Sequence, residues 1–181
     1  KAVEKFGAGT GAARLISGSF QPHKALEESL ANFKGTEAAL SFATGFAAAG
    51  VIPVLAGKGD VIVLDKFSHA CLVDAARLSK AKLRVFKHND LGDLERILRW
   101  TDQQDGQILV VTESVFSMDG DMAPLLNLVE LKERYGAWLM VDEAHATGLY
   151  GEHRCGMVEE FGVRDRVEVQ MGTLGKALGS A

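Results

Sequence analysis

The chain of 181 residues is long enough for one domain, and its 47% apolar and 24% charged residues exclude a wholly disordered protein. A net charge of −4 argues against binding of nucleic acid through a basic surface. Cys71 and Cys155 form no C-x-x-C pair, so we expect no metal site and a reducing, cytoplasmic location.

The first predicted element is a helix over residues 24–33, where apolar residues recur at helical spacing. Residues 38–57 then carry no charge, but they consist largely of Ala, Gly, Ser and Thr and include Pro53. That composition argues against a membrane span. We predict a short strand over 38–43, a turn at Thr44–Gly45 and a buried helix from Phe46.

Helices and strands alternate in the rest of the chain. Alternation at this spacing predicts parallel βαβ units and an α/β fold. Helices are predicted over residues 70–78, 91–100 and 125–135, and strands over 61–64, 83–86, 108–111, 138–141 and 167–171.

In such folds, ligands bind beyond the carboxyl ends of the strands. Lys176 follows the last predicted strand and a Gly-Thr-Leu-Gly loop, among small residues. A desolvated lysine there would offer a neutral amine, which forms Schiff bases with carbonyls and with pyridoxal phosphate. The plainer interpretation is an exposed lysine at the start of a helix.

Asp142 ends a strongly apolar strand and needs a cationic or donor partner, such as the protonated nitrogen of pyridoxal phosphate. His145 follows three residues later and could donate to the phenolic oxygen of that cofactor. A capping aspartate and a core histidine are the alternatives.

Further candidates follow other strands. Thr44, Gly45 and Phe46 open a helix whose N–H groups could bind a phosphate. Hydroxyl groups of Ser117 and Thr173 could add donors, and His69 could stack on a flat ring. Helix capping or core packing would explain each of these residues singly.

Three short motifs suggest other functions. Residues 7–12 fit G-x-G-x-x-A but lack the preceding strand of a dinucleotide site, and residues 172–177 fail the P-loop pattern at two positions. Asp142-Glu143-Ala144-His145 spells the acidic box of a DEAH ATPase, but without a P-loop this alternative is weak.

Together these motifs resemble those of the α-oxoamine synthases, a family of pyridoxal-phosphate enzymes with the aspartate-aminotransferase fold (fold type I). The similar stretches span nearly the whole chain in family order. They are residues 9–18, 23–27, 68–70, 116–120, 141–145 and 172–177.

The resemblance implies a mostly parallel sheet between helices, and condensation of an amino acid with an acyl-CoA with loss of CO₂. Lys176 would hold pyridoxal phosphate and act as base, Asp142 would pair with the ring nitrogen, and His145 with the phenolic oxygen. His69 would stack on the ring and help place the substrate, and Arg14 would also bind substrate. The remaining cofactor contacts would come from Thr44, Gly45, Phe46, Ser117 and Thr173.

Within the family, residues 116–124 are most similar to enzymes that join L-alanine to a pimeloyl thioester of CoA or acyl-carrier protein. Residues 172–179 equally fit enzymes that join glycine to acetyl-CoA. The resemblance further implies that residues 1–181 are a partial cofactor-binding large domain of a longer, homodimeric enzyme with a small C-terminal domain. We expect no partner among nucleic acids or membranes.

Overall fold

A computed structural model describes residues 1–180, which form two compact units, the first of them residues 1–41 and the second beginning at Phe42. The first unit contains three helices among its residues: α1 (Ala2–Phe6), α2 (Arg14–Ser17) and α3 (Gln21–Lys34). Within this unit Arg14 forms an ion pair with Glu27, with Nη1 2.6 Å from Oε1. Burial is slight here, and Ala31 is the buried residue of α3.

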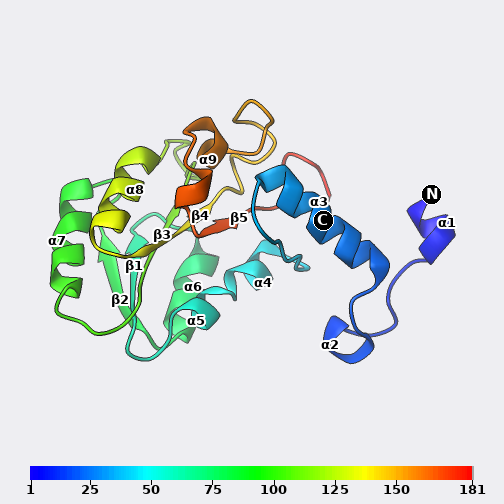
Figure 1. Cartoon of the computed structure of the whole chain (residues 1–181), viewed down its shortest axis with the longest axis horizontal. Coiled ribbons are helices and arrows are strands. Elements are labelled where there is room, and N and C mark those ends of the chain that lie inside the picture. Colours follow the sequence, from blue (N-terminus) through cyan, green and yellow to red (C-terminus); the bar gives the residue numbers. More distant parts are fainter. Residues whose placement is uncertain (181) are drawn as a thin grey trace. The chain divides into compact units, whose positions relative to one another are not determined.

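The second unit is built on a five-stranded sheet in the order β2-β1-β3-β4-β5, in which every neighbouring pair is parallel (Figure 1). Its elements are α4 (Gly45–Ala49), α5 (Ile52–Leu55), β1 (Val61–Asp65), α6 (Ala70–Leu78), β2 (Lys82–Phe86), α7 (Leu91–Thr101), β3 (Ile108–Glu113), α8 (Leu125–Arg134), β4 (Trp138–Asp142), α9 (Met157–Glu160), a 3-10 turn η1 (Arg164–Arg166) and β5 (Val169–Met171).

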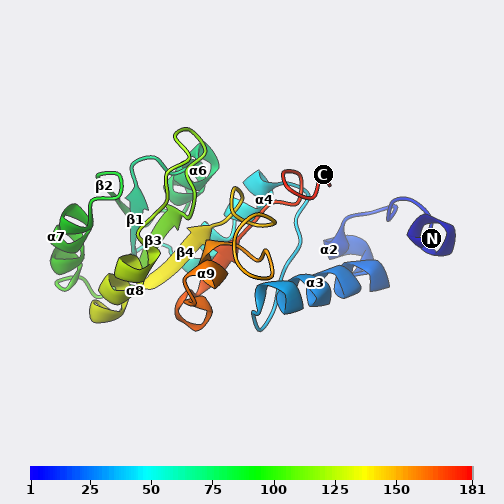
Figure 2. The same cartoon turned by 90° about the horizontal axis from the view of Figure 1, so that it is seen from above.

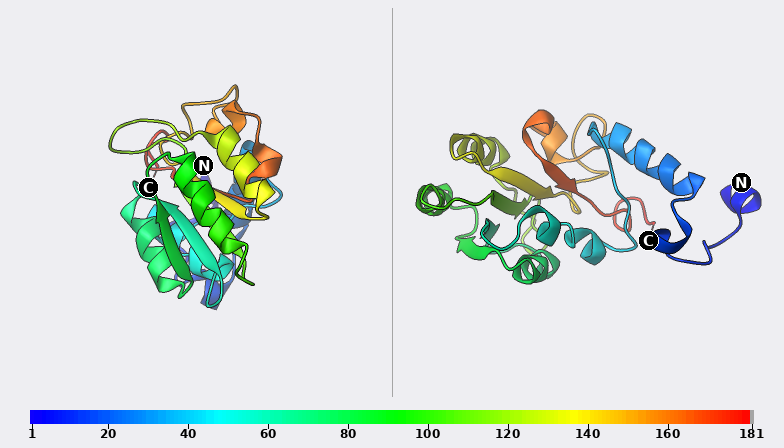
Figure 3. Two further views of the ribbon diagram at one scale, coloured as in Figure 1. Left: turned by 90° about the vertical axis from the view of Figure 1, so that its left-hand side faces the viewer. Right: turned by 60° about the horizontal axis from the view of Figure 1, so that its bottom comes forward.

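Helices cover both faces of this sheet, as Figure 3 shows from two sides. From β1, Val61 and Val63 face the core under α7 and α8, whereas Ile62 and Leu64 face the core under α4, α5 and α6. The chain leaves β1 toward β2 on one side and later reaches β3 on the other. Right-handed crossovers then place the intervening helices on opposite faces.

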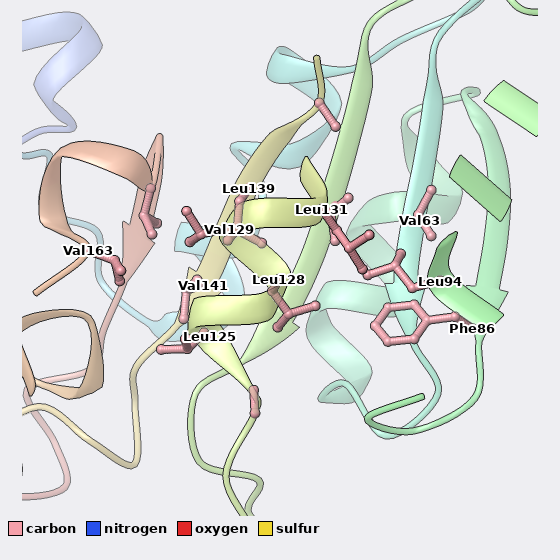
Figure 4. Close-up of a cluster of buried hydrophobic side chains, with 14 of the residues drawn as sticks. Val63, Phe86, Leu94, Leu125, Leu128, Val129, Leu131, Leu139, Val141 and Val163 are labelled. Atoms are coloured by element: carbon pink, nitrogen blue, oxygen red, sulfur yellow. The ribbon is translucent and has the colours of Figure 1, made fainter. Parts of the chain in front are cut away.

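The core beneath α8 explains why residues 125–134 form an amphipathic helix. Leu125, Leu128 and Val129 of α8 project toward Leu139 and Val141 of β4 (Figure 4). Helix α7 lies beside α8 in Figures 1 and 2 and adds Leu94 and Leu98 to the same cluster. This packing fixes where each strand ends, and with it the residues that follow.

The α/β fold and its five parallel strands are confirmed, as are the helices expected over 24–33, 70–78, 91–100 and 125–135. The strand predicted over 38–43 is wrong. The backbone N–H of Ser41 donates to the Glu27 carboxylate at 2.8 Å instead of to a neighbouring strand. The segment is also rich in alanine, which disfavours strands.

The helix expected from Phe46 is divided into two short pieces, α4 and α5, which meet at Gly50–Val51. Ala49 and Ile52 are fully buried against the sheet, so the expectation of burial is met in part of this segment. Within residues 1–180, no helix combines the length and apolar character that a bilayer crossing requires.

Candidate active site

A pocket of about 300 Å³ lies in the second unit, at the carboxyl ends of β3, β4 and β5 and at the start of α6. This volume is at the lower end of the range for small-molecule sites. It adjoins the point between β1 and β3 where the strand order reverses, the usual ligand position in open α/β sheets. The pocket is lined by Gly45, Phe46, His69, Ala70, Cys71, Asp74, Glu113, Asp142, Ala144, His145, Met171, Thr173 and Lys176.

Asp142 supplies a buried carboxylate to this pocket. It is the last residue of β4 and only 4% exposed, and its Oδ1 accepts the backbone N–H of Ala144 at 2.9 Å. Burial raises the pKa of Asp142, against the opposing effects of that hydrogen bond and of the positive charge of Lys176. A cationic ligand group would therefore stabilise the ionised carboxylate.

Lys176 and His145 line the same pocket as Asp142. The Nζ atom of Lys176 donates a hydrogen bond to Oγ1 of Thr173 at 3.1 Å. Burial, and then the positive charge of Lys176, lower the pKa of His145. A lowered pKa keeps the imidazole neutral, so that His145 can donate one hydrogen bond without carrying charge.

Two of the residues that open α4 line the pocket. Gly45 and Phe46 occupy the first helical positions, whose N–H groups have no acceptor within a helix. A Cβ at Gly45 would lie only 3.0 Å from Cγ2 of Thr173, so glycine allows this close approach. Thr44 is the N-cap, and its Oγ1 accepts the N–H of Ala47 at 3.0 Å. Thr44 is not among the described residues that line the pocket.

His69 is the N-cap of α6, directly after the turn that follows β1. Its Nδ1 accepts the backbone N–H of Cys71 at 3.2 Å and lies 3.0 Å from Cys71 Sγ. Because Nδ1 is an acceptor, the proton of the neutral ring resides on Nε2. The Cys71 thiol lines the pocket as well, and burial raises its pKa.

Two other predicted site residues lie elsewhere. Ser117 is exposed in the loop after β3 and is not a pocket-lining residue in the described part of the chain. Arg14 belongs to the first unit, where its guanidinium contacts Glu27 and Ser19.

Glu143 shows why the DEAH sequence is not an acidic metal box here. This carboxylate is fully buried, and its Oε1 accepts the backbone N–H of Val158 at 2.9 Å. A Cβ at Gly156 would lie 2.4 Å from Oε2 of Glu143, so a glycine is required beside it. Glu143 thus holds the start of α9 close to the end of β4.

The profile of the family described as "Aminotransferase class I and II" matches residues 1–181. The chain belongs to this family. It is 55% identical over 181 residues to the 8-amino-7-oxononanoate synthase of Geotalea daltonii, covering 99% of this chain and 46% of that relative. The chain therefore spans about half the length of the curated relatives it matches.

Among solved structures of the family, serine palmitoyltransferase of Sphingomonas wittichii superimposes with a TM-score of 0.93 at 43% identity, over 99% of this chain and 45% of that one. A structure described as SPT with PLP internal aldimine gives a TM-score of 0.93 at 38% identity, over 99% and 45%. The resemblance to α-oxoamine synthases and the fold type I expectation are confirmed by these relatives.

The pocket-lining residues of this aminotransferase-family chain that sequence reasoning did not assign are Ala70, Cys71, Asp74, Glu113, Ala144 and Met171. Glu113 ends β3 and is 2% exposed, and burial and the negative charge of Asp142 raise its pKa to about 7. Its position at a strand end was the available signal, but Ser117 in the same segment drew the assignment. Cys71 gave no signal beyond following His69 by two residues.

Proposed function

We propose that this chain forms the cofactor-binding part of a pyridoxal-phosphate-dependent acyltransferase, which condenses L-alanine with a pimeloyl thioester, releases CO₂ and forms 8-amino-7-oxononanoate. The observation that carries the proposal is the presence of Asp142 and Lys176 in one pocket. The names of relatives that are 48–55% identical supply the product, and the family resemblance supplies the two substrates.

The described residues fit pyridoxal phosphate. Asp142 is a buried carboxylate that has no cationic side chain in hydrogen-bond contact among residues 1–180. A protonated ring nitrogen would supply that cation. Gly45 leaves room where a side chain would meet Thr173. The chemistry supplied by the bound cofactor is an electron sink for the charge left on a substrate α-carbon when CO₂ or a proton departs.

The residues would divide this work by their chemistry. We assign the covalent attachment of the cofactor to Lys176 Nζ, which would also accept and return the proton at the substrate α-carbon. The Asp142 carboxylate would keep the ring nitrogen protonated, and His145 would donate a hydrogen bond to the ring oxygen. The amides of Gly45 and Phe46 and the Thr173 hydroxyl would bind the phosphate.

His69 would lie against the cofactor ring, with Nε2–H directed to the substrate as donor. Thr44 would act through the start of α4, which it caps, and Ser117 would reach the cofactor from its loop. We retain Arg14 as a substrate-binding residue on the resemblance alone. The resemblance likewise supports a homodimer and a small C-terminal domain in the natural protein. It also supports a cytoplasmic location and a role in biotin synthesis.

Two other substrate pairs have support of their own. Residues 172–179 also fit the enzymes that join glycine to acetyl-CoA, and serine palmitoyltransferases are among the similar structures. Each of these alternatives retains the same cofactor and the same bond-forming chemistry. Only the amino acid and the acyl chain differ.

The test uses the full natural chain, purified with pyridoxal phosphate. We expect an absorbance band in the near-visible that borohydride reduction removes, and CoA release from pimeloyl-CoA that requires L-alanine. Turnover only with glycine and acetyl-CoA, or with serine and palmitoyl-CoA, would replace the substrates and leave the chemistry. Absence of the band would refute the proposal.

A further inference from the structure

Glu113 is a buried acid in the pocket with no role in the chemistry assigned above. It is the last residue of β3 and pairs in register with Asp142 on β4, so both side chains leave the sheet on the same side. Their exposed fractions are 2% and 4%. Two carboxylates are thus buried on neighbouring strands and line the same pocket.

The contacts of Glu113 connect two loops that are distant in sequence. Its Oε1 accepts the backbone N–H of His69 at 2.6 Å. The backbone N–H of Ser117 faces the same carboxylate and lowers its pKa. These loops follow β1 and β3, respectively. Both loops carry residues that we assign to the cofactor.

The restraint reaches the His69 ring as well as its backbone. The amide of His69 is held by Glu113, while the ring nitrogen Nδ1 is held by the N–H of Cys71. His69 is thus held at two points, its backbone amide and its ring nitrogen Nδ1. A support of this kind sets the direction in which Nε2 points into the pocket.

Packing alone does not explain an acid at this position. Burial beside Asp142 disfavours the ionised form of Glu113, and an apolar side chain of similar volume would avoid that cost. The carboxylate does offer several acceptor sites at the end of a long side chain, enough to receive two N–H groups.

We propose that Glu113 is a positioning residue of the active site: by accepting the amides of His69 and Ser117, its carboxylate holds both loops at the pocket and sets the orientation of the His69 ring. This inference rests on the proposed function, because the orientation concerns the bound cofactor and substrate. Glu113 itself takes no proton from the substrate.

The test shortens the side chain while keeping its charge. Glu113→Asp withdraws the carboxylate by one methylene group, so it can no longer reach both amides. The matched control is Glu168→Asp. Glu168 also accepts a backbone N–H, that of Leu139 at 2.7 Å, but it does not line the pocket in the described part of the chain.

Both variants are made in the full natural chain and compared by melting temperature, by amide hydrogen exchange without cofactor, by cofactor titration and by circular dichroism of the bound cofactor. We expect both to lower the melting temperature. Only Glu113→Asp should speed exchange at His69 and Ser117, weaken pyridoxal phosphate binding about tenfold and reduce the dichroic signal of the cofactor.

Faster exchange with wild-type cofactor affinity and dichroism would overturn the proposal, because Glu113 would then be merely structural. Unchanged exchange at both amides would overturn it too. A wild-type chain that binds no pyridoxal phosphate would refute the proposed function. The exchange data would still show separately whether Glu113 holds the amides of His69 and Ser117. If Glu113→Asp does not fold, Glu113→Gln keeps the length and leaves one acceptor oxygen, with the same expected directions.

Discussion

The two edges of the sheet use carboxylates in opposite ways. At the amino edge, Asp60 precedes β1 and accepts the N–H groups of Gly57 and Gln107 at 2.7 and 2.8 Å. At the carboxyl edge, Glu113 accepts the backbone N–H of His69 at 2.6 Å and faces that of Ser117, but it lies next to a second buried acid. A carboxylate that accepts backbone N–H groups stabilises the fold at the amino edge. At the carboxyl edge the same contact is present although the two buried acids, Glu113 and Asp142, repel each other when ionised.

Ion pairing explains part of this difference. At the amino edge, Glu168 has Lys132 Nζ at 2.5 Å as well as the N–H of Leu139. At the carboxyl edge, Asp142 has no cation in hydrogen-bond contact within residues 1–180. An edge with uncompensated buried charge is poised for a ligand that compensates it, which is typical of functional sites.

The largest expected effect concerns Lys176. Lys176→Ala removes the only assigned attachment point, so turnover should fall by at least about a thousandfold and the near-visible band should disappear. The matched control at the amino edge is Lys82→Ala, which removes an exposed hydrogen bond to Gln104. That control should keep both the band and the turnover.

The pH dependence of the free energy of unfolding measures the cost of burying the ionised carboxylate of Glu113. Its pKa is about 7 in the folded chain against 4.5 as the reference value, so the folded state binds more protons in between. Stability of the cofactor-free protein should therefore fall as pH rises from 5 to 8, by about 3 kcal/mol from this residue.

Urea unfolding of wild type and Glu113→Gln across that pH range checks this prediction. Hydrogen bonds to Asp65 and Asp121 raise the pKa of His88 although burial opposes them, and that stabilisation is also lost as pH rises. Because His88 titrates in both proteins, only the difference between them reports on Glu113. Parallel curves would contradict the prediction.

Asp142→Asn should separate stability from binding. Burial raises the pKa of the Asp142 carboxyl group, so its ionised form is disfavoured in the fold. Because asparagine carries no charge, the cofactor-free variant should unfold at a higher temperature. With Asp142 paired to the ring nitrogen as proposed, the variant would also lose a charge-assisted hydrogen bond to the cofactor, worth about 1.5–3 kcal/mol, or roughly 10- to 150-fold in affinity. Melting curves and cofactor titration measure the two effects, and a variant that loses both stability and affinity would argue against this division.

The smallest expected effect is that of Asp60→Asn. One of its two acceptor oxygens becomes a donor, so we expect a loss of about 1 kcal/mol in the free energy of unfolding. Cofactor affinity should remain that of the wild type. A change in affinity would show that the two edges are coupled.

The sequence predicted the parallel sheet because predicted strands alternate with helices, and because β1 is a continuous apolar run that ends in an acid, a pattern that suits burial on both faces. Residues at strand ends led directly to Asp142, His145 and Lys176. The strand predicted over 38–43 was wrong because the local sequence pattern cannot show that the carboxylate of Glu27 accepts the backbone N–H of Ser41. Glu113 escaped notice because its role lies in backbone contacts across 44 residues.

The order of the strands also has a consequence for how the chain acquires its structure. Strand β1 pairs with β2 on one side and with the much later β3 on the other, and each strand is separated from the next by a helix. Contacts so distant in sequence slow the search for the native state. During synthesis, Val61–Leu64 emerges well before Ile108 can pair with it, so this apolar segment is exposed to association with other chains until β3 arrives.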